Sequence, residues 1–311
     1  MHSDDLHIED AMVSSLVDRD LPEHALQPLT KLKAAGSTNT LYRLGPDLLV
    51  RLPRRPGGGA SIIKEARWTP LLADALPIAV PQVVTVGNPG FGYPENWSVT
   101  RWLEGEHPVR AEPGVEPGVE AAAVRSALAE DLANVIGALR ALEVPADPGP
   151  ELRWYRGSAL AGFDSAVRTY IDQCRTLDGL DVDLVKAEVL WEEALTLPGA
   201  QGAGPDRWYH GDLVAENLLV ANGRIVAVLD LGSVSVGDPT VDLHGAWEIL
   251  DAPARALFAA KLGVTEAEWL RGRAWALGIA LGALAYYWNT LPERRRDRLA
   301  MLRNVLDSYL D

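Results

Sequence analysis

Residues 208–232 read WYHGDLVAENLLVANGRIVAVLDLG, and this stretch holds the densest group of functional side chains in the sequence. Two apolar runs, LLV and IVAVL, flank an Asn-Gly pair that favours the tight turn of a β-hairpin. Asp212 and Asn217, five residues apart, precede the first run, and Asp230 follows the second run. We therefore predict a hairpin that brings three oxygen-bearing side chains together, against the alternative of a surface hairpin with incidental acids.

The pattern H-G-D-x-x-x-x-N followed by D-x-G is the spacing of a kinase catalytic loop and its metal-binding segment, with Gly211 where protein kinases have Arg. In that arrangement Asp212 accepts the proton of an acceptor hydroxyl. Asn217 and Asp230 supply the hard oxygen ligands that Mg²⁺ prefers. His210 is expected to fix the loop through hydrogen bonds rather than to bind a metal.

The chain resembles the aminoglycoside phosphotransferase family. The family signature continues with G-D-P-x-x-D-L, which is present here at 237–243, and the resemblance extends from the turn at Gly36 to the C-terminal helices. It implies a kinase-like fold, ATP or GTP as phosphoryl donor with Mg²⁺, and a hydroxylated acceptor. Asp242 is expected to be structural, capping a helix and accepting N–H groups of the loop.

The periodicity of the chain becomes helical from about residue 120, and the strand-like segments end near residue 104. Before residue 104, strand-like alternation at 26–52, 79–86 and 96–103 surrounds one helix at 62–76. After it, helical spacing dominates. We predict an α+β, protein-kinase-like two-lobed fold, with a nucleotide-binding lobe at 1–103 and a catalytic and substrate-binding lobe at 104–311.

Nucleotide contacts are assigned with the help of the resemblance. A phosphate loop is expected between the first two strands, although it has one glycine only, and Arg51 stands where kinases carry the phosphate-orienting Lys. Glu65 on the following helix is expected to pair with Arg51, and the strand WSVTRWLEG resembles the hinge that meets the purine. The predicted nucleotide-binding residues are Ser37, Thr38, Asn39, Arg51, Glu65, Arg101 and Leu103.

Composition narrows the class of partner. The formal net charge of −14 disfavours nucleic acid and anionic membranes and suits a cationic small molecule, although it also agrees with simple solubility. The apolar stretch 274–288 is too short to span a membrane, so we expect a buried helix. Cys174 is the single cysteine, and the acidic N-terminal segment lacks the pattern of a secretory signal, which predicts a cytoplasmic protein without disulfides.

These observations predict a small-molecule O-phosphotransferase, with an aminoglycoside or macrolide antibiotic as the first choice of acceptor. A metabolite kinase acting on a sugar, amino alcohol or fructosamine is the alternative enzyme, because the same catalytic set serves all of them. A nucleotide-binding pseudokinase is the alternative outside enzymes. A protein kinase is disfavoured, because the segment after Asp230 is short and has no APE-type end. The residues considered for acceptor contact are Trp247, Glu248, Trp275 and Tyr286.

Overall fold

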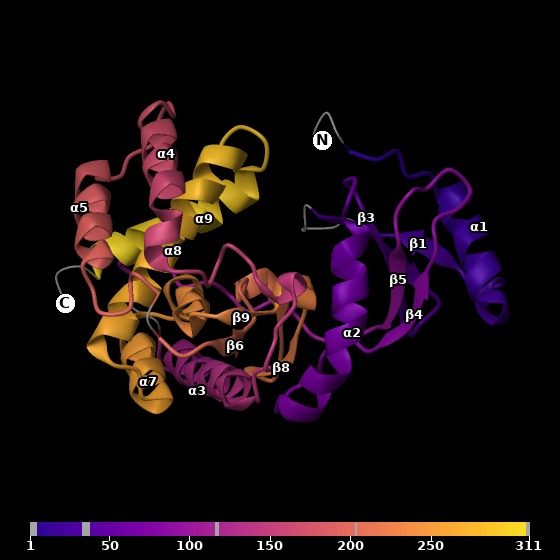
Figure 1. Cartoon of the computed structure of the whole chain (residues 1–311), viewed down its shortest axis with the longest axis horizontal. Helices are drawn as coiled ribbons and strands as arrows, with labels where there is room; N and C mark the ends of the chain where they lie inside the picture. Colours follow the sequence, from indigo (N-terminus) through magenta and orange to yellow (C-terminus); the bar gives the residue numbers. More distant parts are fainter. Residues whose placement is uncertain (1–4, 33–37, 116–117, 203, 309–311) are drawn as a thin grey trace. The chain divides into compact units, whose positions relative to one another are not determined.

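The computed structural model describes residues 5–32, 38–115, 118–202 and 204–308. Contacts within the chain divide it into two compact units, both drawn in Figure 1. Unit 1 comprises Met1–Gly105 and Ala227–Gly232, and unit 2 comprises Glu106–Val226 and Ser233–Asp311.

Unit 1 is built around an antiparallel sheet of five strands in the order β1-β2-β3-β5-β4. A short turn at residues 45–47 joins β2 to β3, as the alternating pattern predicts. The elements are α1 (Asp10–Asp20), the 3₁₀ turn η1 (Pro22–His24), β1 (Leu29–Lys31), β2 (Asn39–Leu44), β3 (Leu48–Pro53), α2 (Gly59–Ala75), β4 (Val83–Gly87) and β5 (Trp97–Arg101).

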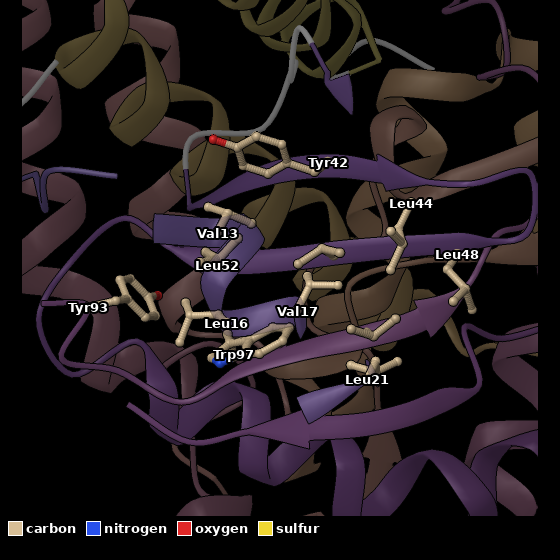
Figure 2. Close-up of a cluster of buried hydrophobic side chains, with 12 residues drawn as sticks. Val13, Leu16, Val17, Leu21, Tyr42, Leu44, Leu48, Leu52, Tyr93 and Trp97 are labelled. Atoms are coloured by element: carbon tan, nitrogen blue, oxygen red, sulfur yellow. The ribbon is translucent and has the colours of Figure 1, made fainter. Parts of the chain in front are cut away.

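The two faces of this sheet have different roles. Strand pairing places Tyr42, Val50 and Val99 in one row, and this face packs against the apolar side of α1 in a cluster that Figure 2 shows. Because side chains alternate along a strand, Arg51 points to the opposite face. There it meets Glu65 of α2, so the helix that the sequence predicts faces the polar side of the sheet.

The helix α1 is a feature that sequence analysis missed. Val13, Leu16 and Val17 form its single apolar stripe within an otherwise acidic segment, and all three are buried. Tyr42 of β2 donates its hydroxyl proton to Asp10 at 2.8 Å. The helix therefore closes one face of the sheet, and the spacing of these three apolar residues was the available signal.

Unit 2 is mainly helical, with two small antiparallel strand pairs, β6-β9 and β7-β8. The predicted helix at 240–250 is a 3₁₀ segment, η6 (Pro239–Gly245), followed by one short α-helix. The helices are α3 (Val119–Ala141), α4 (Asp164–Arg175), α5 (Leu184–Leu195), α6 (Ala246–Ile249), α7 (Ala252–Leu262), α8 (Glu266–Tyr287) and α9 (Pro292–Asp307). Three further 3₁₀ turns are η2 (Pro150–Leu152), η3 (Leu160–Phe163) and η4 (Ala215–Asn217), and a fourth, η5 (Leu231–Ser233), crosses the boundary between the units.

Helix α8 forms the centre of unit 2, and it contains most of the apolar stretch that was expected to be buried. A capping box between Thr265 and Glu268 starts the helix. Gly278 and Gly282 lie against the rings of Phe163 and Tyr170, where an added Cβ would come within 2.8 Å of either ring. Small residues on α8 thus admit aromatic side chains from η3 and α4. Within the described residues, no helix is long and apolar enough to cross a bilayer.

The predicted hairpin is formed by β7 (Leu218–Ala221) and β8 (Arg224–Val228), and its turn residues Asn222 and Gly223 have φ of +52° and +73°. Positive φ at both positions suits the twist of a tight hairpin. Asp131 of α3 braces the hairpin by accepting the Ile225 N–H at 2.9 Å. The last residues of β8 belong to unit 1, where the Val228 N–H donates to the Ala79 carbonyl at 3.0 Å. The remaining strands are β6 (Arg207–Tyr209) and β9 (Ser235–Gly237).

Candidate active site

The loop that carries Asp212 in unit 2 is held from beneath by a buried carboxylate. Asp242 of η6 is 1% exposed, and its two oxygens accept the backbone N–H groups of His210 and Gly211, each at 2.7 Å. His210 is buried as well, and its Nδ1 accepts the backbone N–H of Asp212 at 3.2 Å. The loop conformation is therefore fixed by side chains that bind its backbone, which agrees with the expected role of His210.

Only part of the prediction for Asp242 is right. It accepts N–H groups of the loop, but the residue that caps the following helix is Asp238, whose side chain accepts the Thr240 N–H at 3.0 Å. Each oxygen of Asp242 accepts an N–H group of the loop, and the N-cap of the following helix is Asp238. Desolvation raises the pKa of Asp242 and exceeds the opposing effects of His210 and of the two backbone hydrogen bonds.

Both carboxylate oxygens of Asp212 have partners. Arg156 donates to Oδ1 at 2.6 Å, and the amide nitrogen of Asn217 donates to Oδ2 at 3.2 Å. Desolvation would raise the pKa of Asp212, but the attraction of positive charges, Arg156 first, lowers it to about 2. Burial lowers the pKa of His244 to about 4, so at neutral pH guanidinium groups supply that attraction. Asp212 is therefore ionised at neutral pH, as a proton acceptor must be.

Asn217 ends η4 and is oriented by the same loop. Its amide nitrogen donates to the backbone carbonyl of Asp212 at 2.8 Å as well as to the carboxylate. Because the nitrogen is engaged in this way, the amide oxygen points away from Asp212 and can accept from another group. This orientation fits the metal-ligand role that the sequence predicts, a role that stays a prediction.

A second ionic cluster, which sequence analysis missed, ties the loop to helix α9. Glu248 of α6 accepts from Arg110 at 2.7 Å and from Arg298 at 2.8 Å, and one of its oxygens accepts the Ala215 N–H at 3.3 Å. Glu216, next in the loop, pairs with Arg294 at 2.7 Å. These residues come from four separate parts of the sequence, Arg110, residues 215–216, Glu248 and residues 294–298, so only the fold brings them together.

In unit 1, three of the predicted site residues form a contiguous cluster. Arg51 of β3 donates to Glu65 of α2 at 2.5 Å and contacts Asp230 at 3.4 Å, and both Arg51 and Glu65 are buried. Desolvation would lower the pKa of Arg51, but the carboxylates of Glu65 and Asp230 outweigh it and raise the pKa. Arg51 therefore stays charged while one carboxylate holds it on each side.

Asp230 has a backbone conformation that is uncommon for a residue with a side chain, with φ of +55°. The left-handed region costs a non-glycine residue about 1 kcal/mol or more, although aspartate tolerates it better than most. Such strain often occurs at functional positions. The side chain of Asp230 is 38% exposed, so its carboxylate remains accessible beside Arg51.

The other predicted nucleotide residues of unit 1 lie at strand ends. Thr38 and Asn39 are at the start of β2, with the Asn39 amide donating to the Thr38 hydroxyl at 3.3 Å, and Ser37 lies outside the described residues. The Arg101 N–H donates to the Gln82 carbonyl at 2.8 Å, so this N–H is already used within the sheet, and the contact of Arg101 with a base stays a prediction. Leu103 follows the end of β5 by two residues.

Three of the four residues considered for acceptor contact are wrong. Trp247, Glu248 and Trp275 are all buried in unit 2, because they fill the core or the ionic cluster described above. Tyr286 on α8 is exposed. Trp275 and Tyr286 both lie on α8, which is apolar on nearly every side, so spacing along the sequence does not sort its aromatic residues into core and surface.

No three His, Cys, Asp or Glu side chains in the described ranges are grouped so as to hold a metal alone. The predicted ligand set, a carboxylate from Asp230 and an amide oxygen from Asn217, is instead typical of Mg²⁺ sites that use water and phosphate oxygens for the remaining positions. The exposed carboxylate of Asp230 and the amide oxygen of Asn217 both fit that ion chemically.

The sequence pattern described as the phosphotransferase enzyme family matches residues 30–275. No curated protein matches the chain.

Several solved structures share the fold. A GDP complex of a wild-type aminoglycoside 2'-phosphotransferase-IIIa superposes with a TM-score of 0.69 at 18% identity, covering 97% of this chain and 99% of that one. The ADP-bound aminoglycoside phosphotransferase APH(2'')-Ib gives a TM-score of 0.63 at 15% identity, covering 96% and 99%. The apoenzyme of macrolide 2'-phosphotransferase MphH from Brachybacterium faecium gives 0.57 at 21% identity, covering 94% and 97%. The predicted α+β, kinase-like fold is thereby confirmed.

Proposed function

The chain belongs to the phosphotransferase enzyme family, and from this premise we propose that it transfers the γ-phosphoryl group of ATP or GTP to a hydroxyl of a small molecule. The acceptor that we propose is an aminoglycoside or a macrolide. Family membership establishes the enzyme class, whereas donor, metal and acceptor belong to this proposal. In it, residues 1–103 bind the nucleotide and residues 104–311 provide catalysis and acceptor binding.

The observation that carries the proposal is the state of Asp212. Its carboxylate is ionised, 31% exposed, and fixed on a loop whose backbone is bound by Asp242. A general base needs a free lone pair, an ionised form and a fixed position. Each carboxylate oxygen has two lone pairs, so the hydrogen bonds from Arg156 and Asn217 leave room for an acceptor hydroxyl.

In the proposed reaction Asp212 accepts a hydrogen bond from the acceptor hydroxyl and takes its proton as the oxygen attacks the γ-phosphorus. The oxygen–phosphorus bond forms while the bond to the leaving nucleoside diphosphate breaks, and the diphosphate takes the charge. Arg51 would contact the phosphates of the donor in unit 1, with Glu65 fixing the orientation of its guanidinium. A planar guanidinium can donate two parallel hydrogen bonds to phosphate oxygens.

Asp230 and Asn217 would hold Mg²⁺, which when bound neutralises phosphate charge during transfer. Solved structures with this fold include GDP- and ADP-bound phosphotransferases, which supports a nucleotide donor. The acceptor is proposed by analogy with the aminoglycoside and macrolide enzymes among them.

The deciding experiment is a coupled assay of nucleoside diphosphate release with ATP and with GTP over aminoglycosides, macrolides, sugars, amino alcohols and fructosamines. Asp212→Asn, which keeps the size of the side chain, is the matched control. We expect transfer to an antibiotic by the wild-type chain and a loss of roughly 10² to 10⁴ in kcat for the variant, with nucleotide affinity nearly unchanged.

Other outcomes would replace the proposal. Transfer to a metabolite alone would assign a metabolite kinase. Nucleotide binding without transfer to any acceptor would indicate a pseudokinase. An equal loss of nucleotide binding and turnover in Asp212→Asn would contradict the role of Asp212 as the base.

A further inference from the structure

The segment 153–158 of unit 2 carries Arg156, a residue that no sequence pattern singled out. Its guanidinium donates the shortest hydrogen bond that the Asp212 carboxylate accepts, with 2.6 Å between Nη1 and Oδ1. A second, longer contact of 3.5 Å joins the same nitrogen to the Gly211 carbonyl. Arg156 lies 56 residues before Asp212 in the chain, so this contact depends on tertiary structure alone.

Arg156 is held before any substrate binds. Its Nε donates to the Tyr155 hydroxyl at 3.0 Å, and its guanidinium lies 4.9 Å from the centroid of a Trp154 ring. The side chain is 20% exposed. Ion pairs that stack on an aromatic ring and lose their water are stronger and more rigid than surface pairs.

The backbone around Arg156 is anchored to the strand pair β6-β9. The Tyr209 hydroxyl donates to the Arg156 carbonyl at 2.5 Å, and the Asp238 N–H donates to the Gly157 carbonyl at 2.7 Å. Gly157 has φ of +83°, and an added Cβ would lie 2.3 Å from the Tyr209 ring. Both the side chain of Arg156 and the backbone of its segment are therefore held in place by hydrogen bonds.

The same segment explains why residue 211 is a glycine. Its φ is +84°, which favours glycine, and an added Cβ would lie 2.8 Å from the Trp154 ring. Because there is no side chain at this position, Trp154 packs against the loop and presents a ring to Arg156. Gly211 and Arg156 are thus parts of one arrangement around Asp212.

Each oxygen of the Asp212 carboxylate accepts a hydrogen bond, Oδ1 from Arg156 and Oδ2 from Asn217. An aspartate side chain turns about two bonds, and two donors on different oxygens fix both rotations. A base that is held in one orientation has its lone pairs directed before the acceptor arrives, which lowers the entropy cost of reaching the transition state.

We propose that Arg156 is a positioning residue for phosphoryl transfer, acting by holding the Asp212 carboxylate in a single orientation. This inference rests on the proposed function, in which Asp212 is the base. Since Arg156 acts through Asp212 rather than by binding a substrate, removing it should lower kcat and leave the KM of both substrates unchanged.

The experiment compares Arg156→Ala and Arg156→Lys with Arg153→Ala as matched control. Arg153 lies in the same segment and pairs with Asp206 at the same distance of 2.6 Å, but this pair is half exposed and does not involve Asp212. We expect kcat to fall about 10- to 100-fold in Arg156→Ala, less in Arg156→Lys, and not at all in Arg153→Ala.

Chemical rescue separates positioning from a general structural role. Guanidinium chloride, at concentrations far below those that unfold proteins, should restore part of kcat in Arg156→Ala by occupying the vacated place. It should restore nothing in Asp212→Asn, where the carboxylate itself is missing. Thermal melts of each variant check that the folded fraction is unchanged.

Three results would overturn the inference. The first is an unchanged kcat in Arg156→Ala. The second is a raised KM for the acceptor with normal kcat, which would make Arg156 a substrate contact. The third is a lowered kcat that guanidinium does not restore. An active wild-type chain with any of these results would refute this inference alone. A wild-type chain that transfers nothing would refute the proposed function as well.

Discussion

Two buried carboxylates, Glu65 in unit 1 and Asp242 in unit 2, are equally hidden from water but have different kinds of partner. Glu65 is 3% exposed and holds the side chain of Arg51, whereas Asp242 is 1% exposed and holds two backbone N–H groups. A side-chain partner can be removed together with the carboxylate, but a backbone N–H cannot. The first pair can therefore be dispensable for folding, while the second interaction is part of how the loop folds.

The difference also separates the parts of the site by task. In the proposed function Arg51 contacts the phosphates of the nucleotide, so loss of the charges around it should affect nucleotide binding first. The charges around Asp242 and Glu248 bind the loop that carries Asp212, so their loss should affect the fold of the loop and activity together. Five predictions test this contrast.

The largest effect is expected for Asp242→Ala, which leaves the N–H groups of His210 and Gly211 buried without acceptors. Each unsatisfied donor costs about 1 to 3 kcal/mol, so unfolding free energy should fall by about 2 to 6 kcal/mol. Urea denaturation measures this loss. Asp242→Asn, which keeps one acceptor oxygen, should lose about half as much, and equal stability of all three proteins would refute the role of Asp242.

The next effect is expected for the pair in unit 1. Glu65→Leu should cost about 3 kcal/mol, because the Arg51 charge stays buried with one partner fewer. Arg51→Met combined with Glu65→Leu should recover most of that stability, since no buried charge is left, yet nucleotide affinity should remain lost. Additive stability effects of the two substitutions would contradict the pairing.

Nucleotide kinetics refine the same pair. Arg51→Lys should raise the nucleotide KM partly and Arg51→Ala more, because an ammonium cannot make the two parallel hydrogen bonds of a guanidinium. Glu65→Ala should resemble Arg51→Ala in KM. Normal kinetics in Arg51→Ala would make this arginine a structural residue only.

Asp230→Asn should have a large effect on activity and almost none on stability. The variant removes a charged ligand for Mg²⁺, so transfer should fall more than about 100-fold. Asn also tolerates the left-handed region. The contact of Asp230 with Arg51 is long, at 3.4 Å, and partly exposed, and Glu65 still pairs with Arg51, so unfolding free energy should change by less than about 0.5 kcal/mol. Calorimetry with and without Mg²⁺ checks the assignment, since metal-dependent nucleotide binding should disappear.

The smallest effect concerns Cys174, a buried thiol of α4 in unit 2. Its Sγ lies 3.6 Å from the Leu281 carbonyl, and burial raises the pKa to about 11. At neutral pH the reactive thiolate is therefore scarce, and labelling by an aromatic disulfide reagent should be slow until unit 2 opens. Labelling of Cys174 should become faster in Asp242→Ala and stay slow in Glu65→Leu. An equally faster labelling in both variants would contradict the expected difference between the two carboxylates.

Much of the fold follows from patterns that lie within short stretches of sequence. The alternation before residue 53 gives β2 and β3, and the Asn-Gly pair gives the hairpin turn with positive φ at Asn222 and Gly223. Helix α1 was missed because three apolar residues in an acidic segment give a weak signal. The 3₁₀ form of η6 was missed because its i→i+3 bonds follow from buried packing around Asp242 rather than from propensity.

The candidate site also contains residues that the sequence predicts and residues that only the structure reveals. His210, Asp212, Asn217 and Asp230 were found because they lie within one short stretch at fixed offsets, where the spacing itself reflects the chemistry. Arg156 and the cluster around Glu248 were not found, because their partners are far apart in the chain and no local pattern connects them.

The sequence by itself determined most of the strands and helices, the family, and the oxygen-bearing residues of the loop that carries Asp212, since all of these depend on the spacing of neighbours along the chain. Tertiary structure alone decided which charges surround those residues. It placed Arg156 against Asp212 and Asp242 beneath the loop, and it buried Trp247 and Trp275. The reason is physical, because burial, desolvation and charge pairing depend on distances in space that distant parts of a sequence do not encode locally.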